Sequence, residues 1–240
     1  MVTRWVLVAA CLGAVGCGEA PRVLKKVDAA TAGRVAGVVR FGGVAPAARR
    51  VTMDAAECAG LHASAVMVED VAVRDGRLAG AFVWVKSGLE AYEFEVPATP
   101  VVMDQVGCMF VPRVIGVRVG QRFVMKNSDP VMHNVHSMPV VNDVYNRGFP
   151  GKDVVQETSF GDPEVMVPVR CDLHSWMTGH VGVVAHPFFA VTGADGQFQF
   201  EGLPPGEYVL EAWHETLGTA RKAIKLGVKE SGKIEIVFGP

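Results

Sequence analysis

The stretch Cys171-Asp172-Leu173-His174-Ser175-Trp176-Met177 has the pattern C-x-x-H-x-x-M and places three candidate metal ligands within seven residues. Thiolate and thioether sulfurs favour Cu(I), whereas imidazole binds either oxidation state of copper. A lone buried cysteine is more often an inert packing residue. Here a histidine three positions later and a methionine six positions later make packing a poor explanation. The stretch therefore predicts a metal-binding loop with Cys171, His174 and Met177 as ligands.

A second histidine is needed to complete a set of two imidazoles, one thiolate and one weak axial thioether, which is the arrangement of blue-copper electron-transfer sites. His133 offers it, within Asn127-Ser128-Asp129-Pro130-Val131-Met132-His133-Asn134-Val135. His136 is the rival, and in an extended segment only one of the two side chains can face the metal. One cysteine and two histidines with solvent also suit zinc, but a methionine in the fourth position favours copper.

The N-terminal residues indicate export. In residues 1–17 a positive charge at Arg4 precedes an apolar run that ends in small residues, which is the pattern of a secretory signal peptide. Ala14-Val15-Gly16-Cys17 resembles the lipobox of bacterial lipoproteins, which implies a lipid on Cys17, a membrane anchor and a periplasmic or cell-envelope location. Simple cleavage, an uncleaved anchor and a lipid on Cys11 remain alternatives. Residues 18–32 are expected to form a tether.

Three cysteines follow the export segment, namely Cys58, Cys108 and Cys171. In an oxidising compartment an odd number leaves one thiol unpaired. If Cys171 is a metal ligand, Cys58 and Cys108 remain to form a disulfide, and two buried free thiols are the alternative. The net charge of −2 and the absence of a basic run favour no nucleic-acid partner.

The apolar residues are mostly valines in short runs between glycines and prolines, which predicts β-strands. Asp75-Gly76 predicts a hairpin turn, and Val165–Cys171 is the strand expected to deliver the ligand loop. Residues 54–62 are expected to form one or two helical turns. Because no segment shows the period of a long amphipathic helix, the sequence predicts an all-β fold of sandwiches or barrels.

Residues 98–186 resemble the cupredoxins, the family that includes plastocyanin, amicyanin and related methylamine-utilisation proteins. The resemblance lies in Val117-Arg118-Val119-Gly120, Lys126-Asn127-Ser128-Asp129, His133-Asn134-Val135 and the short C-x-x-H-x-x-M loop, which is like that of amicyanins. It implies a Greek-key β-sandwich that binds one type 1 copper ion. The His-Asn-Val pattern implies His133, rather than His136, as the fourth ligand.

The same resemblance implies roles for residues beside the ligands. Asn134 is expected to donate its backbone N–H to the Cys171 sulfur and to tie two loops together, and Trp176 is expected to lie next to the ligands. In related cupredoxins the histidine at the position of His174 has an exposed edge, through which electrons enter or leave.

A second resemblance involves Val191-Thr192-Gly193-Ala194-Asp195-Gly196-Gln197-Phe198 and Leu203-Pro204-Pro205-Gly206-Glu207-Tyr208-Val209-Leu210, which are similar to the carboxypeptidase regulatory-like, or prealbumin-like, β-sandwich. Two strands usual in that family stand far upstream, as Gly33–Val39 and Gly80–Val85. We therefore expect residues 33–97 and 187–240 to form one discontinuous sandwich into which the cupredoxin domain, 98–186, is inserted. Three consecutive units, with 33–97 packed on the cupredoxin, are the alternative.

Together these patterns predict an exported mononuclear blue-copper protein that carries single electrons, with a c-type cytochrome or a dehydrogenase as partner. Arg170 and Asp172 flank the thiolate where multicopper oxidases have histidines, so we expect no oxygen reduction and no enzyme activity. A copper-delivery protein shares the same ligands and is the second hypothesis. A structural or carbohydrate-contacting surface module is the third.

Overall fold

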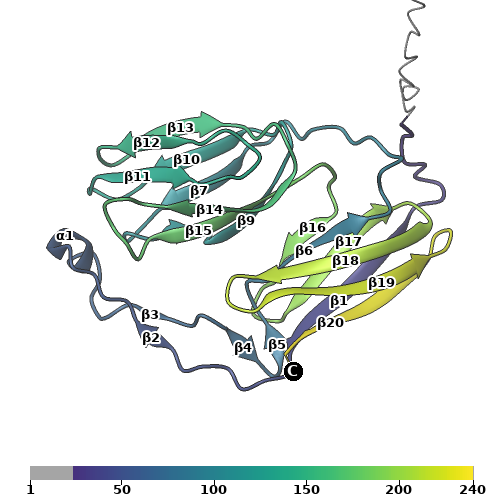
Figure 1. The fold of residues 1–240 in the computed structure, drawn as a ribbon, viewed down its shortest axis with the longest axis horizontal. Helices are drawn as coiled ribbons and strands as arrows, with labels where there is room; N and C mark the ends of the chain where they lie inside the picture. Colours follow the sequence, from purple (N-terminus) through teal and green to yellow (C-terminus); the bar gives the residue numbers. More distant parts are fainter. Residues whose placement is uncertain (1–23, 240) are drawn as a thin grey trace, which may run out of the picture.

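The computed structural model describes residues 24–239 (Figure 1). The predicted export segment, with Cys11 and the lipidation candidate Cys17, lies outside the described residues. Within residues 24–239 no helix has the length and apolar character needed to cross a membrane. The all-β prediction is confirmed, because the one helix of this part is α1 (Ala56–Ala59) and strands form the rest of the framework.

One β-sandwich, here called the inner sandwich, is built from residues 101–184. Its two sheets pack valine, phenylalanine and methionine side chains between them, among them Phe123, Met125 and Phe149. One sheet has the order β13 (Val154–Thr158), β10 (Phe123–Asn127), β7 (Val101–Gln105), β8 (Phe110–Val111). The other has the order β12 (Asn146–Phe149), β11 (His133–Ser137), β14 (Glu164–Arg170), β15 (Thr178–Val184), β9 (Val114–Arg118).

The second sandwich, here called the outer sandwich, combines strands from before and after the inner one (Figure 1). In one sheet β1 (Gly33–Phe41) pairs with β17 (Gln197–Leu203), β20 (Ser231–Phe238) and β5 (Arg77–Leu78), and β5 pairs with β4 (Val73–Arg74). In the other sheet the order is β16 (Phe189–Val191), β6 (Phe82–Ser87), β18 (Gly206–His214), β19 (Gly218–Leu226). The predicted turn at Asp75-Gly76 joins β4 and β5, with both residues at positive φ.

Strand β6 connects the two sandwiches because both of its faces are buried. Val83 and Val85 lie in the core of the outer sandwich. Phe82 and Trp84 point the other way, into a cluster with Val184 of β15. Alternate side chains of β6 thus point into two different hydrophobic clusters, instead of one face pointing into a core and the other into solvent.

Residues 49–68, here called the arm, leave the outer sandwich after β1 and extend to the inner one (Figure 1). The arm contains β2 (Arg49–Arg50), α1 and β3 (Met67–Val68), and β2 pairs with β3. At its tip Cys58 forms a disulfide with Cys108, which lies between β7 and β8. The helix occupies part of the segment 54–62 that the sequence predicts as helical turns.

Candidate metal centre

The ligand loop is the connection between β14 and β15. Strand β14 ends at Arg170, which pairs with His136 near the end of β11. Because the two strands are antiparallel, the start of β11 lies beside the ligand loop that follows Arg170. The loop closes on itself, since Cys171 N–H donates to Met177 O at 3.1 Å and Met177 N–H donates to His174 O at 2.9 Å. These contacts fix the spacing of the C-x-x-H-x-x-M motif within one tight turn.

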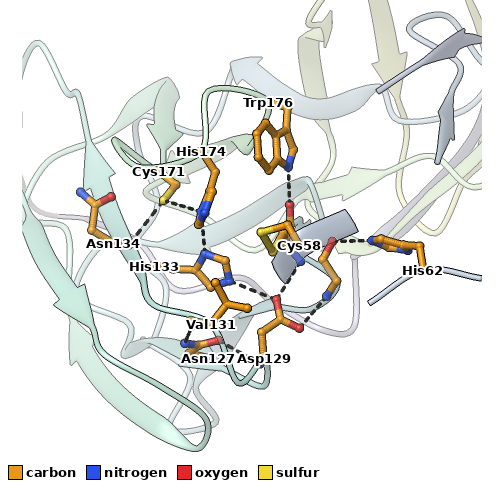
Figure 2. Close-up of a disulfide and its surroundings, with 12 residues drawn as sticks. Cys58, His62, Asn127, Asp129, Val131, His133, Asn134, Cys171, His174 and Trp176 are labelled. Atoms are coloured by element: carbon orange, nitrogen blue, oxygen red, sulfur yellow. Dashed lines mark hydrogen bonds and ion pairs between the residues drawn. A yellow bond between two sulfur atoms is a disulfide. The ribbon is translucent and has the colours of Figure 1, made fainter. Parts of the chain in front are cut away.

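Three of the four predicted ligands converge in the interior of the inner sandwich (Figure 2). Nδ1 of His133 lies 3.0 Å from Nδ1 of His174, and Nδ1 of His174 lies 3.6 Å from Cys171 Sγ. All three side chains are buried. Met177 is fully buried and belongs to the same core cluster as Cys171.

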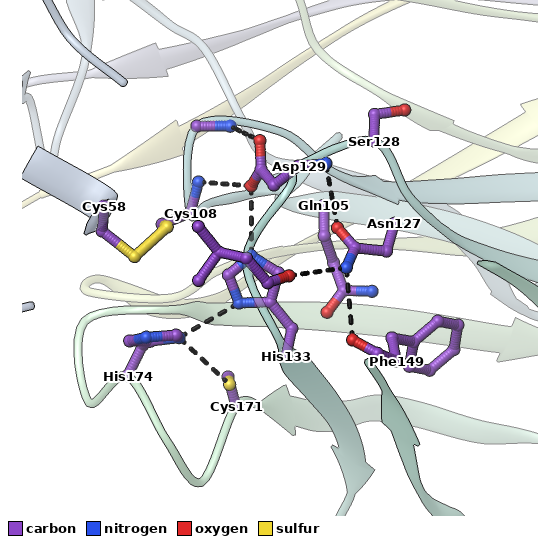
Figure 3. A network of polar contacts seen from close by, with 12 residues as sticks. Cys58, Gln105, Cys108, Asn127, Ser128, Asp129, His133, Phe149, Cys171 and His174 are labelled. Atoms are coloured by element: carbon purple, nitrogen blue, oxygen red, sulfur yellow. Dashed lines mark hydrogen bonds and ion pairs between the residues drawn. A yellow bond between two sulfur atoms is a disulfide. The ribbon is translucent and has the colours of Figure 1, made fainter. Parts of the chain in front are cut away.

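Asp129 contacts the side of the His133 ring that faces away from His174 (Figure 3). Its carboxylate is buried, and the sequence did not predict it as part of the site. Its Oδ2 lies 3.1 Å from His133 Nε2, and its two oxygens accept the N–H groups of Gly107 and Cys108, each at 2.7 Å. A carboxylate accepts, so Nε2 of His133 carries the proton and Nδ1 presents its lone pair to His174 and Cys171. The signal in the sequence was an aspartate four residues before the candidate ligand.

Asn134 lies where the cupredoxin resemblance places it. Its backbone N–H points at Cys171 Sγ at 3.5 Å. Its side-chain oxygen accepts the Asp172 N–H at 2.6 Å, and its amide nitrogen donates to the Asp172 carboxylate at 2.9 Å. The residue therefore joins the start of β11 to the ligand loop on both sides of the thiol.

The two imidazoles are held in the neutral form that metal binding requires. Burial lowers the pKa of His133, and the neighbouring His174 adds to this effect. Burial also lowers the pKa of His174, although the carboxylates of Glu57, Asp54 and Asp129 oppose the shift. Neutral imidazole is the metal-binding form, so both groups are ready as ligands near neutral pH.

His174 is buried and keeps only a small exposed part, since 5% of the residue is accessible, whereas His133 is fully buried. The Trp176 ring lies against His174, with centroids 5.1 Å apart. Trp176 Nε1–H in turn donates to Cys108 O at 3.0 Å. The Trp176 ring, tied to the β7–β8 connection through Cys108 O, thus covers one side of His174.

The other histidines make contacts away from the ligands. His136 pairs with the Asp172 carboxylate at 3.0 Å, and His62 contacts Gly107 O at 2.9 Å. The His180 ring lies against the Trp213 ring at a tilt, with centroids 4.8 Å apart. His186 binds the backbone of β6 and His214 accepts the Thr216 N–H.

The donor set fits a copper ion, because it offers one thiolate, two neutral imidazoles and a thioether in a buried pocket of the fold. The alternative group of Cys108, Asp129 and His133 also lies within 4.8 Å. Cys108 is bonded to Cys58, so its sulfur is not a free thiol. The group of His133, Cys171 and His174 contains the free thiol of Cys171.

No family model and no curated protein matches this chain. Among solved structures, the purple cupredoxin from Nitrosopumilus maritimus aligns with 34% of this chain and 97% of its own, at 22% identity and a TM-score of 0.30. The Cu(I) form of an amicyanin variant aligns with 42% of this chain and 97% of its own, at 23% identity and a TM-score of 0.32.

The copper-containing nitrite reductase from Thermus scotoductus aligns with 40% of this chain and 24% of its own, at 23% identity and a TM-score of 0.31. These structure neighbours are cupredoxins or copper proteins. At such TM-scores we take nothing further from them, and the metal assignment depends on the ligand geometry. The resemblance of the outer sandwich to the carboxypeptidase regulatory-like family stays a prediction.

Proposed function

We propose that this protein is a mononuclear type 1 copper protein that carries single electrons between exported redox partners. The observation that supports it is the convergence of Cys171 Sγ and the Nδ1 atoms of His133 and His174 in the interior of the inner sandwich, with Met177 in the same core cluster as Cys171. A copper ion bound there supplies the Cu(II)/Cu(I) couple. The protein residues supply a stiff set of donors, which keeps the change in structure between the two oxidation states small.

In this proposal Asp129, Asn134 and the burial of the site each have a different role. Asp129 orients His133 and keeps its proton on Nε2. The N–H of Asn134 withdraws charge from the Cys171 sulfur, which favours the reduced state of the metal. Burial excludes water from the pocket, so oxidation state changes without a change of ligand.

The wider setting belongs to the same proposal. We place the protein in the periplasm or cell envelope, anchored by a lipid on Cys17, and expect a c-type cytochrome or a dehydrogenase as partner. We assign the strands of 33–97 and 187–240 to a discontinuous carboxypeptidase regulatory-like sandwich around the inserted domain 98–186. The pairing of β1 with β17 and β20 supports this division.

The experiment is a visible spectrum of the purified protein loaded with Cu(II). A thiolate bonded to Cu(II) gives an intense charge-transfer absorption, so we expect a strongly coloured protein and loss of the colour in Cys171→Ser. His136→Gln is the matched control, because His136 lies on the same strand as His133 and contacts Asp172 instead. A folded protein that binds Cu(II) without the absorption contradicts the proposal.

One observation favours a second candidate, a copper-storage or copper-delivery protein. His174 is enclosed, and a direct contact between this imidazole and a redox partner is therefore blocked. Electron exchange with small redox proteins separates the two functions. Fast exchange supports the carrier, and slow exchange with an intact colour supports delivery.

A further inference from the structure

The arm supplies none of the predicted ligands, yet it lies against the end of the metal centre at His174 (Figure 2). Met53 and Ala55 pack on the core of the inner sandwich, which contains Cys171 and Met177. A segment that begins and ends in the outer sandwich therefore forms part of the wall of a site in the inner one.

A covalent bond holds the arm in this position. Cys58 of α1 and Cys108 of the β7–β8 connection form the disulfide, and both residues are fully buried. The hydrogen bond from His62 to Gly107 O lies beside it. At the base, β2 and β3 pair over two residues each, a length that is marginal without further support. The disulfide is therefore the main attachment between the tip of the arm and the inner sandwich.

The Cys58–Cys108 disulfide is connected to the imidazoles of His133 and His174 through the backbone N–H and C=O groups of Cys108. Cys108 N–H donates to Asp129, which holds His133. Cys108 O accepts from Trp176, whose ring covers His174. A displacement of Cys108 thus moves the supports of both His133 and His174.

We propose that the arm is a cap on the metal centre and that the Cys58–Cys108 disulfide is its latch. With the bond closed, a metal carrier or a redox partner cannot touch His174. A dithiol opens the latch by passing two electrons and two protons to the bond, which gives the thiols of Cys58 and Cys108 and a disulfide on the reagent. This inference rests on the proposed function, because it assigns a means of access to the same site.

The test measures access to Cys171 in metal-free protein, so that it does not depend on copper chemistry. Cys11→Ser and Cys17→Ser are present throughout, and labelling of each remaining cysteine by iodoacetamide is followed separately by mass spectrometry. In the parent, Cys171 is 3% accessible, so we expect it to react slowly. In the double variant Cys58→Ser and Cys108→Ser we expect its labelling rate to rise about tenfold or more, because the thiol becomes exposed by local opening.

Two controls separate opening of the cap from general unfolding. Val39→Ala loosens the core of the outer sandwich without touching the arm, and its Cys171 labelling is expected to match the parent. If the double variant does not fold by circular dichroism, the parent treated with a dithiol gives the same comparison, because Cys171 is read separately from Cys58 and Cys108.

The outcomes decide between the readings. Faster labelling of Cys171 on opening the disulfide, with Val39→Ala unchanged, supports the cap. An unchanged rate in a folded protein with the disulfide open overturns it, and so does an equal rise in Val39→Ala. A colourless Cu(II) protein contradicts the proposed function but does not affect the labelling result. Failure of the proposed function can therefore be told apart from failure of the cap proposal.

Discussion

The Nδ1 atoms of His133 and His174 lie 3.0 Å apart, although the residues are separated by 41 positions in the chain. Asp129 fixes the proton of His133 on the opposite nitrogen, so the ring presents a lone pair to its neighbour. Two imidazoles and a thiol placed in this way can bind one metal ion together. The predictions below concern the groups that maintain this arrangement.

Replacing Asp129 by asparagine is expected to weaken copper binding by roughly 10- to 100-fold, the usual effect of removing a group that orients a metal ligand. The amide lacks the charge that holds the His133 proton and the N–H groups of Gly107 and Cys108. Competition titration against a chelator measures the change. Asp162→Asn, at an exposed position, is the control, and an affinity equal to the parent in Asp129→Asn contradicts the assigned role.

Asn134→Ala is expected to lower the reduction potential of the copper-loaded protein. The alanine loses both side-chain bonds to Asp172, so the backbone N–H moves away from the Cys171 sulfur and the thiolate donates more charge to the oxidised metal. Cyclic voltammetry gives the direction. Asn142→Ala, in the loop between β11 and β12 and bonded to Glu164 instead of the ligand loop, is a matched asparagine control. A rise in potential for Asn134→Ala refutes this reasoning.

Gly182→Ala is expected to destabilise the protein by about 1–3 kcal/mol, the typical cost of overpacking. Gly182 of β15 is the register partner of Gly116 of β9, and a Cβ at either position overlaps the rings of the interface around Phe82. Urea denaturation measures the loss. Gly161→Ala, where a Cβ meets open space, is expected to be neutral. In Phe82→Ala the added cost of Gly182→Ala should fall, and full additivity argues against the contact.

The stability of the protein is expected to fall between pH 6.5 and about 4 through His186. Burial lowers the pKa of His186 to about 4. Its Nε2 donates to Val85 O at 2.7 Å and its Nδ1 accepts the Phe188 N–H. The unfolded state with its higher pKa takes up the proton first, so stability is full above pH 6.5 and decreases by up to about 3 kcal/mol as pH falls to 4.

His186→Gln removes this titration, so the loss of stability between pH 6.5 and 4 should be smaller than in the parent. Thermal denaturation across this range measures it. At pH 8, where His186 is neutral in both states, the comparison reports only the changed hydrogen bonds. Parallel pH profiles for the parent and the variant would show that His186 is not responsible.

Much of the candidate site was predictable from local sequence. The C-x-x-H-x-x-M spacing belongs to one loop, and local hydrogen bonds close that loop around Met177. Strand alternation excluded a joint role for His133 and His136, and the resemblance of His133-Asn134-Val135 to the cupredoxin pattern favoured His133. Asn134 followed from its position next to His133. Asp129 was missed because a buried carboxylate and an exposed turn aspartate look the same in sequence.

The arm shows why the rest was not predictable. Arg49 to Val68 carries short strands and one turn of helix, and nothing in its pattern says which sandwich it covers. The cysteine count allowed a bond between Cys58 and Cys108. The position of this bond beside Trp176 and His174 depends on where the tip of the arm lies in the folded protein. The exposed His174 edge was expected on the basis of a single domain, and a second part of the chain covers it.

The sequence by itself determined the all-β character and the chemistry of the ligands, because valine-rich alternation and soft donor spacing act over a few residues. Tertiary structure alone decided how His133 meets His174 and how the arm closes over them. These contacts join segments far apart in the chain, and their formation depends on the packing of whole sheets. The loop Cys171–Met177 carries three of the four predicted ligands, and the fold around it brings His133 to them.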